Sequence, residues 1–131
     1  MIGLDTNILV RYFAQDDAGQ SALANRLMGT LTKDEPGFVS AVVLCELVWV
    51  LEDVYGLEKS ALCNILRTLL ESNDLAIESK PVAWSAFNDY SQAPLDFSDA
   101  LIAGFGKHAG CRHTMTFDKR AARMPAFKLL T

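Results

Sequence analysis

Short apolar runs alternate with longer segments of helical periodicity along the whole chain, and this order limits the possible folds more than any other sequence feature. It is typical of a parallel sheet, because consecutive parallel strands need a crossover connection, usually a helix. The 131 residues suit one domain spanning residues 1–131. We predict an α/β domain with helices on both faces of the sheet and strands at 2–4, 38–39, 75–77, 112–117 and 127–130.

The connecting segments carry helix start and stop signals. Ser40 precedes an apolar helical run that Gly56 should end, and Gly110 should end the helix that follows Asp96 or Ser98. In the second helix we expect Ala22, Leu23, Leu27 and Leu31 to share the buried face. The predicted helices cover 6–13, 16–31, 41–55, 57–72, 81–92 and a segment ending at His108, with a helical turn at 119–123.

The charge balance and the cysteines restrict the class of protein. The formal net charge of −4 argues against attachment to nucleic acid by bulk charge alone, but a local basic patch remains compatible with it. Three cysteines without a CxxC pair favour free thiols in a reducing compartment. The N-terminal residues lack the features of a signal peptide, and Glu46 interrupts the longest apolar run. We expect a soluble cytoplasmic protein without a membrane partner.

Several acidic residues lie at the carboxyl ends of predicted strands or in the helices that follow them. Asp5 ends the first strand, and Asp118 ends the strand at 112–117. Asp96 and Asp99 lie at the start of a helix, and Glu46 lies within the helix after the second strand. Ligands of such sheets bind outside the carboxyl ends of the strands, so these side chains can converge there.

Each acid also has an ordinary structural interpretation. Asp5 could cap the following helix, Asp96 with Asp99 resembles a capping box, and Asp118 could be a solvated turn residue. Glu46 could pair with a cation or face solvent. It lies in AVVLCELVWVL, which is apolar almost all round and should be buried, and a buried unpaired carboxylate is costly. Three or four convergent carboxylates without His or Cys suit Mg²⁺ or Mn²⁺ and suit zinc poorly.

Four ordered motifs give the chain a family resemblance. LDTN at 4–7, VSAVVLCELVWVL at 39–51, LDFSDALIA at 95–103 and MTFD at 115–118 resemble the four motifs of PIN-domain nucleases, and together they look most like VapC-type toxins of toxin–antitoxin modules. The resemblance makes Asp5, Glu46, Asp99 and Asp118 the catalytic and metal-binding acids. Asn7, Asp96 and Thr116 would support them.

The resemblance implies a three-layer α/β/α fold whose five-stranded parallel sheet has the order 3-2-1-4-5, with Asp5 beside Asp118. It also implies cleavage of RNA with Mg²⁺ or Mn²⁺, a homodimer, and a cognate antitoxin that blocks the site. Our hypothesis is that Asp5 and Asp99 are the main metal ligands, that Glu46 and Asp118 complete the site, and that the cation activates the attacking water. Candidate RNA-binding residues are Arg11, Lys107, Arg112, Lys119 and Arg120.

Three alternatives remain beside this hypothesis. A haloacid-dehalogenase-type phosphatase needs a second Asp at the position of Asn7, which disfavours it. A non-catalytic RNA-binding or partner-binding PIN module would be expected to have lost acidic residues. A PIN nuclease of RNA processing remains open, and a neighbouring antitoxin gene would distinguish it from a toxin.

Overall fold

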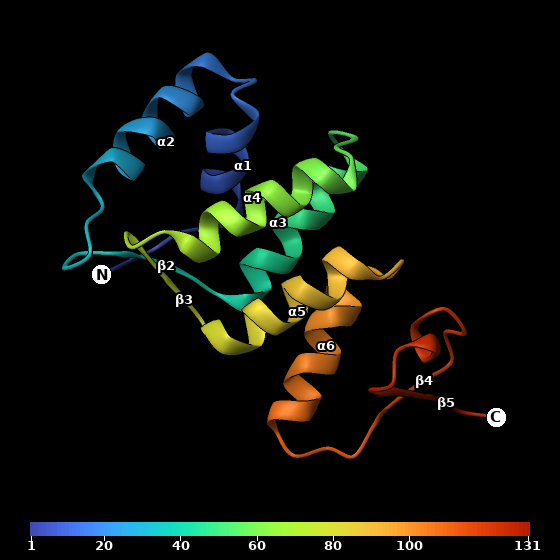
Figure 1. The fold of residues 1–131 in the computed structure, drawn as a ribbon. Coiled ribbons are helices and arrows are strands. Elements are labelled where there is room, and N and C mark those ends of the chain that lie inside the picture. Colours follow the sequence, from blue (N-terminus) through green and yellow to red (C-terminus); the bar gives the residue numbers. More distant parts are fainter. The chain divides into compact units, whose positions relative to one another are not determined.

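A computed structural model describes all 131 residues and confirms the alternation of strands and helices. The chain forms two compact units, residues 1–80 and residues 81–131. The elements of the first unit are β1 (Ile2–Gly3), α1 (Thr6–Ala14), α2 (Ala18–Thr30), β2 (Gly37–Val39), α3 (Ala41–Asp53), α4 (Lys59–Glu71) and β3 (Leu75–Ile77). Figure 1 shows α3 and α4 packed side by side in this unit.

The three strands of the first unit form a parallel sheet in the order β1-β2-β3. Gly37 lies opposite both Ile2 and Leu75 in the register. Beyond the ladder, the Leu4 amide donates to the Phe38 carbonyl at 2.9 Å and so carries the pairing up to Asp5. β1 is an edge strand, with one side free of any strand partner.

The helix boundaries follow local chemistry. The Ser40 hydroxyl accepts from the Val43 amide and caps α3, as predicted, and Asp17 caps α2 through the Gln20 amide. Gly56 has a φ of 68° and follows the end of α3. Its amide donates to the Glu52 carbonyl, which closes the helix as the sequence predicted.

Leucines dominate the core of the first unit. The fully buried side chains include Leu9, Leu44, Leu47, Leu62 and Leu66, which come from α1, α3 and α4. Apolar spacing predicted these three helices because each buries one stripe.

The buried face predicted for α2 is wrong for Ala22 and Leu23, although Leu31 is buried and Leu27 is half-buried. The structure buries Ser21 and Ala24, whereas Leu23 is 60% exposed and Ala22 is also exposed. The reason is that small residues allow α2 to lie close to α1, where the Ser21 hydroxyl donates to the Arg11 carbonyl at 2.9 Å.

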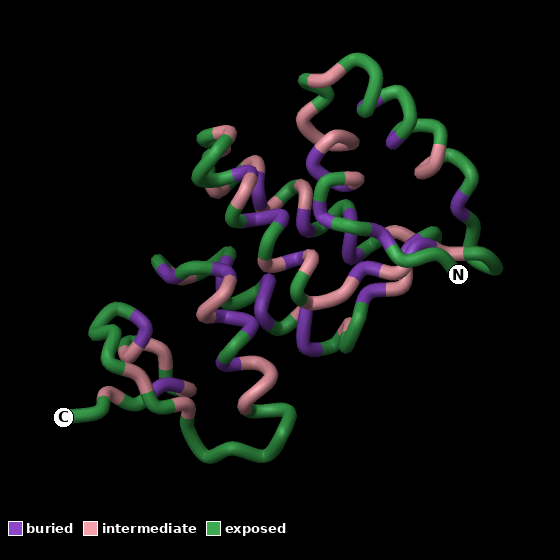
Figure 2. Tube along the Cα trace, turned by 180° about the vertical axis from the view of Figure 1, so that it is seen from behind, coloured by how far each residue is buried: buried purple, intermediate pink, exposed green.

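The second unit begins one residue after the start of α5 (Lys80–Gln92). It also contains α6 (Phe97–His108), β4 (Thr114–Thr116), the short 3₁₀ helix η1 (Ala121–Arg123) and β5 (Phe127–Leu129). β4 and β5 form a two-stranded parallel sheet. A small apolar core joins Ala103 of α6 to Ala121 and Phe127. In Figure 2, exposed residues gather in the segment after α6 and at the C-terminal end.

The expected five-stranded sheet appears as two sheets, one of three strands and one of two. The parallel pairings β1-β2, β2-β3 and β4-β5 agree with the predicted order. The remaining pairing, β1 with β4, stays a prediction. No helix of the chain combines the length and apolarity needed to cross a membrane.

Gly37 should be irreplaceable at the centre of the first sheet. A Cβ there would lie 2.8 Å from Cδ1 of both Leu4 and Leu31 and 3.1 Å from Cδ2 of Leu75, and all three leucines are buried. We expect Gly37→Ala to lower the free energy of unfolding by about 1–3 kcal/mol through overpacking. Urea denaturation measures this change.

Gly29 provides the matched control. It lies in α2, and a Cβ at this position would meet nothing within 4 Å. Gly29→Ala should therefore stabilise the chain by up to about 1 kcal/mol, the helix-propensity difference. Equal unfolding midpoints for the two variants would contradict the packing argument.

Candidate active site

Asp5 and Glu46 are connected through Thr6. Asp5 occupies the N-cap of α1, where its Oδ1 accepts from the Thr6 amide at 2.8 Å. The Thr6 hydroxyl, on a side chain only 7% exposed, donates to Oε1 of Glu46 at 2.7 Å. The end of β1 and the middle of α3 therefore hold two of the predicted acids against one buried hydroxyl.

The predicted burial of Glu46 is wrong. α3 buries Leu44, Leu47, Val48 and Leu51, whereas Glu46 is exposed on another face. That face also carries Val42 and Trp49, which are 67% and 60% exposed. The apolar composition of α3 predicted burial all round, but the helix packs along one stripe. Since Glu46 is exposed, the cost of burying its charge is no argument for a role as a metal ligand. The hydrogen bond from Thr6 is the structural argument for that role instead.

In the second unit, Asp96 and Asp118 lie within electrostatic reach of Asp99. Partial burial raises the pKa of Asp99, and the negative charges of Asp96 and Asp118 raise it further, while Arg120 acts in the opposite direction. Since these charges act on one carboxyl, the structure brings Asp96, Asp99 and Asp118 together with one guanidinium. Asp99 also lies in the first turn of α6, where the helix dipole favours a negative charge.

Of the three acids of this cluster (Asp96, Asp99 and Asp118), Asp118 is held by backbone amides. Oδ1 of Asp118 accepts from the amides of Arg120 and Ala121 at 2.8 and 3.3 Å, and the Asp118 amide donates to the Thr116 hydroxyl at 3.0 Å. Asp96 occupies the N-cap position of α6, yet its side chain makes no capping bond. The capping-box alternative therefore fails for the Asp96 side chain, which stays available.

The donor chemistry of both acid groups fits a hard divalent cation. Asp5, Glu46 and Asp118 each use one carboxylate oxygen within the protein, and the other oxygen makes no bond. Such oxygens, without nitrogen or sulfur nearby, are the ligands of Mg²⁺ and Mn²⁺. Within neither unit alone do three acidic, His or Cys side chains come close enough to hold a metal ion.

The candidate RNA-binding cations have different surroundings. Arg11 pairs with Asp16 at 3.2 Å and also donates to Tyr55 and Gln20, so its charge serves the contact of α1 with its neighbours. Tyr55 donates to Asp16 and lowers the pKa of that carboxyl. The other candidates, Lys107, Arg112, Lys119 and Arg120, are exposed.

Three of these cations border cavities of the second unit. Lys107 and Arg112 line a cavity of about 300 Å³ together with His113. Arg120 donates from Nε to the Pro94 carbonyl at 2.6 Å and lines a second cavity. Asn7 is exposed in α1 and lines the groove between α1 and α2. Its predicted bond to a carboxylate remains a prediction.

Comparisons with known proteins decide the family. The chain matches the family described as "PIN domain" over residues 2–126. It belongs to the PIN domain family. It is also similar to a protein named "VapC ribonuclease" from Aquifex aeolicus (strain VF5), with 26% identity over 121 residues, which are 92% of this chain and 90% of that protein. No solved structure matches the chain significantly.

The sequence analysis did not identify Thr6 as a site residue. The signal was present: a hydroxyl stands directly after Asp5 within LDTN. What the sequence could not reveal is a contact across 40 positions with Glu46.

Thr6→Val keeps the side-chain shape and removes the donor to Glu46. We expect the free energy of unfolding to fall by about 1–2 kcal/mol, the usual range for a lost hydrogen bond with a buried partner. Thr6→Ser retains the hydroxyl and should lose less. If Thr6→Val is equally destabilising in a Glu46→Ala background, which has no acceptor, as urea titration would measure, the two side chains are not coupled.

Proposed function

We propose that this chain is a metal-dependent endoribonuclease and the toxin component of a toxin–antitoxin module. The proposal rests on one observation above all. A PIN family chain carries an acid at each of four motif positions, and Asp96, Asp99 and Asp118 lie within electrostatic reach of one another. The similarity to a protein named a VapC ribonuclease supports RNA as the substrate.

The complete site needs both acid groups. We propose that β4 pairs with the free edge of β1, which would give one domain spanning residues 1–131 and one sheet in the order 3-2-1-4-5. Unpaired edge strands expose backbone donors and acceptors that favour a further strand. Ile2 and Met115, on these two strands, are 53% and 49% exposed and would be covered by the pairing. Asp5 and Asp118 then follow neighbouring strands at the same sheet edge.

In this arrangement the carboxylates of Asp5, Glu46, Asp99 and Asp118 would hold Mg²⁺ or Mn²⁺. Bound there, the cation would supply charge stabilisation for the phosphodiester and a water of lowered pKa. The rest of the protein holds these carboxylates in position. Thr6 fixes Glu46, the amides of η1 fix Asp118, and Thr116 fixes the backbone before it. The exposed Arg120 stands beside Asp99 and can meet a phosphate oxygen of the substrate.

The partners follow from the same family similarity. We propose that the substrate is RNA, that Lys107, Arg112 and Lys119 add cationic contacts to its backbone, that the chain forms a homodimer in the cytoplasm, and that an antitoxin protein covers the acid groups. A PIN nuclease of RNA processing is the alternative, and it would act without an antitoxin.

Asp99→Asn should abolish ribonuclease activity while leaving the fold intact. It removes a charged ligand, and disturbing even the outer shell of a metal site costs up to about 100-fold in activity. We expect cleavage of single-stranded RNA to fall at least about 100-fold, with an unchanged urea midpoint. Chelation by EDTA should abolish wild-type cleavage, and added Mg²⁺ or Mn²⁺ should restore it.

Asp53→Asn is the matched control, because Asp53 is the exposed last residue of α3, outside both acid groups. Paramagnetic Mn²⁺ tests the convergence of these groups directly. It should broaden the amide signals near Asp5 and near Asp99 at the same concentration. Broadening near Asp99 alone would overturn the four-carboxylate site, and full activity of Asp99→Asn would overturn the nuclease proposal.

The toxin role predicts a growth effect that depends on the same carboxylate. Induced expression of the wild-type chain should arrest growth, and expression of Asp99→Asn should not. Co-expression of the product of the adjacent gene should relieve the arrest. Growth measurements with mapping of RNA ends check this result, and cleavage without relief by the neighbouring product would favour RNA processing.

A further inference from the structure

A cavity of about 390 Å³ in the second unit lies next to the acids of that unit and has no role in the proposed chemistry. It lies between the end of α5, the turn before α6 and the segment around η1. Its volume lies in the range of small-molecule sites. Asp89, Arg120 and Arg123 provide its charged lining, and Pro94, Leu95 and Met124 provide apolar surface.

The charged side chains that line this cavity are not held in salt bridges. Asp89, Arg120 and Arg123 all line it, yet none of them forms an ion pair. The Pro94 carbonyl binds Nε of Arg120 and so orients the guanidinium, whose two terminal nitrogens make no bond. The cavity lining therefore offers carboxylate acceptors and guanidinium donors that no salt bridge occupies.

The cavity adjoins the proposed site through the chain itself. Leu95, which lines it, precedes Asp96, and Arg120 follows Asp118 by two residues. Arg120 also acts electrostatically on Asp99. A group bound in the cavity would therefore lie within about one nucleotide of a phosphate held by these acids.

We propose that this cavity binds one unpaired guanine of the RNA substrate, next to the cleaved phosphodiester. This inference rests on the proposed ribonuclease function. Proteins read single-stranded RNA by hydrogen bonds to base edges and by stacking against apolar or guanidinium surfaces. Guanine alone among the four bases presents O6 and N7 as a pair of acceptors and N1–H and N2–H as a pair of donors.

The cavity residues match these two edges. The guanidinium of Arg123 binds O6 and N7, the commonest specific contact of arginine with a base. The carboxylate of Asp89 accepts from N1–H and N2–H. Adenine and cytosine place an acceptor nitrogen toward Asp89, and uracil offers it a single donor. Met124 and Pro125 contact the base plane, and Arg120 lies on the phosphate side.

Cleavage of a randomised single-stranded RNA pool, with the ends sequenced, tests the base preference. The wild-type chain should favour guanine within one or two nucleotides of the cut. Asp89→Asn should lower that preference about tenfold or more, since a bidentate contact is worth this much discrimination. It should also raise the relative use of adenine, which an amide can contact. A general loss of stability would lower all cleavage without changing the preference.

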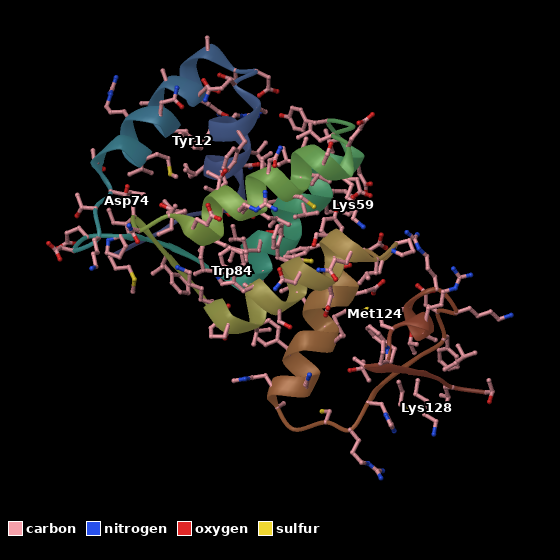
Figure 3. All side chains as sticks on the ribbon, in the orientation of Figure 1. Tyr12, Lys59, Asp74, Trp84, Met124 and Lys128 are labelled. Atoms are coloured by element: carbon pink, nitrogen blue, oxygen red, sulfur yellow. The ribbon has the colours of Figure 1, made fainter.

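Asp53→Asn and Lys128→Ala are the matched controls, because both residues are exposed and neither lines the cavity. Figure 3 shows Met124 beside η1 and Lys128 on β5. Both controls should retain the wild-type preference. Cleavage by the wild-type chain without guanine preference, or a preference that survives both Asp89→Asn and Arg123→Ala, overturns the proposal.

A binding measurement without metal separates this inference from the proposed nuclease function. In EDTA, guanosine 5′-monophosphate should shift the ¹³C-methyl signal of Met124, and adenosine 5′-monophosphate should shift it much less. Asp89→Asn should remove the difference. A guanine-specific shift in a chain that cleaves no RNA would support the cavity and overturn the nuclease. Cleavage without any shift would support the nuclease and overturn the cavity.

Discussion

The mutual repulsion of carboxylates around Asp99 is the constraint on which the proposed site depends. Asp99 is partly buried beside Asp96 and Asp118, so ionisation of all three concentrates negative charge in one place. The first turn of α6 and the Arg120 guanidinium offset part of this repulsion. Partial burial, and then the two neighbouring carboxylates, raise the pKa of Asp99, so the positive groups of the chain do not offset the full cost of ionising it. A bound cation would supply the remaining positive charge, and this need gives the arrangement its chemical meaning.

Local signals in the sequence predicted most of the fold. Ser40 and Gly56 delimit α3 through bonds between near neighbours, and such bonds depend on a few consecutive residues. The strand at 75–77 was also predicted with the right bounds. The buried face of α2 could not be predicted, because close contact with α1 selects Ser21 and Ala24 over the larger Leu23. The proposed pairing of β1 with β4 would join residues more than a hundred positions apart, for which periodicity carries no signal.

The site was predictable to the extent that it resides in motifs. Asp99 and Asp118 were chosen from their places at a helix start and a strand end, and the structure brings them together. Glu46 was chosen for a burial that it does not have. The hydrogen bond from Thr6 joins the first and second motifs and holds the Glu46 carboxylate in place. This contact, rather than burial, supports a site role for Glu46. The sequence offered no reason to select Asp89, because a charged residue on a helix is ordinarily a solvated one.

Arg120 links the acids of the second unit to the cavity beside them. Its Nε is bound to the Pro94 carbonyl, so the turn before α6 and the turn after β4 are tied by one side chain. The amide of the same residue donates to Oδ1 of Asp118. A base that entered the cavity and displaced the guanidinium would therefore disturb an acid of the site, whereas a base that fits beside it would leave that acid in place. In such an arrangement base recognition and cleavage share a structural element, and selectivity needs no separate domain.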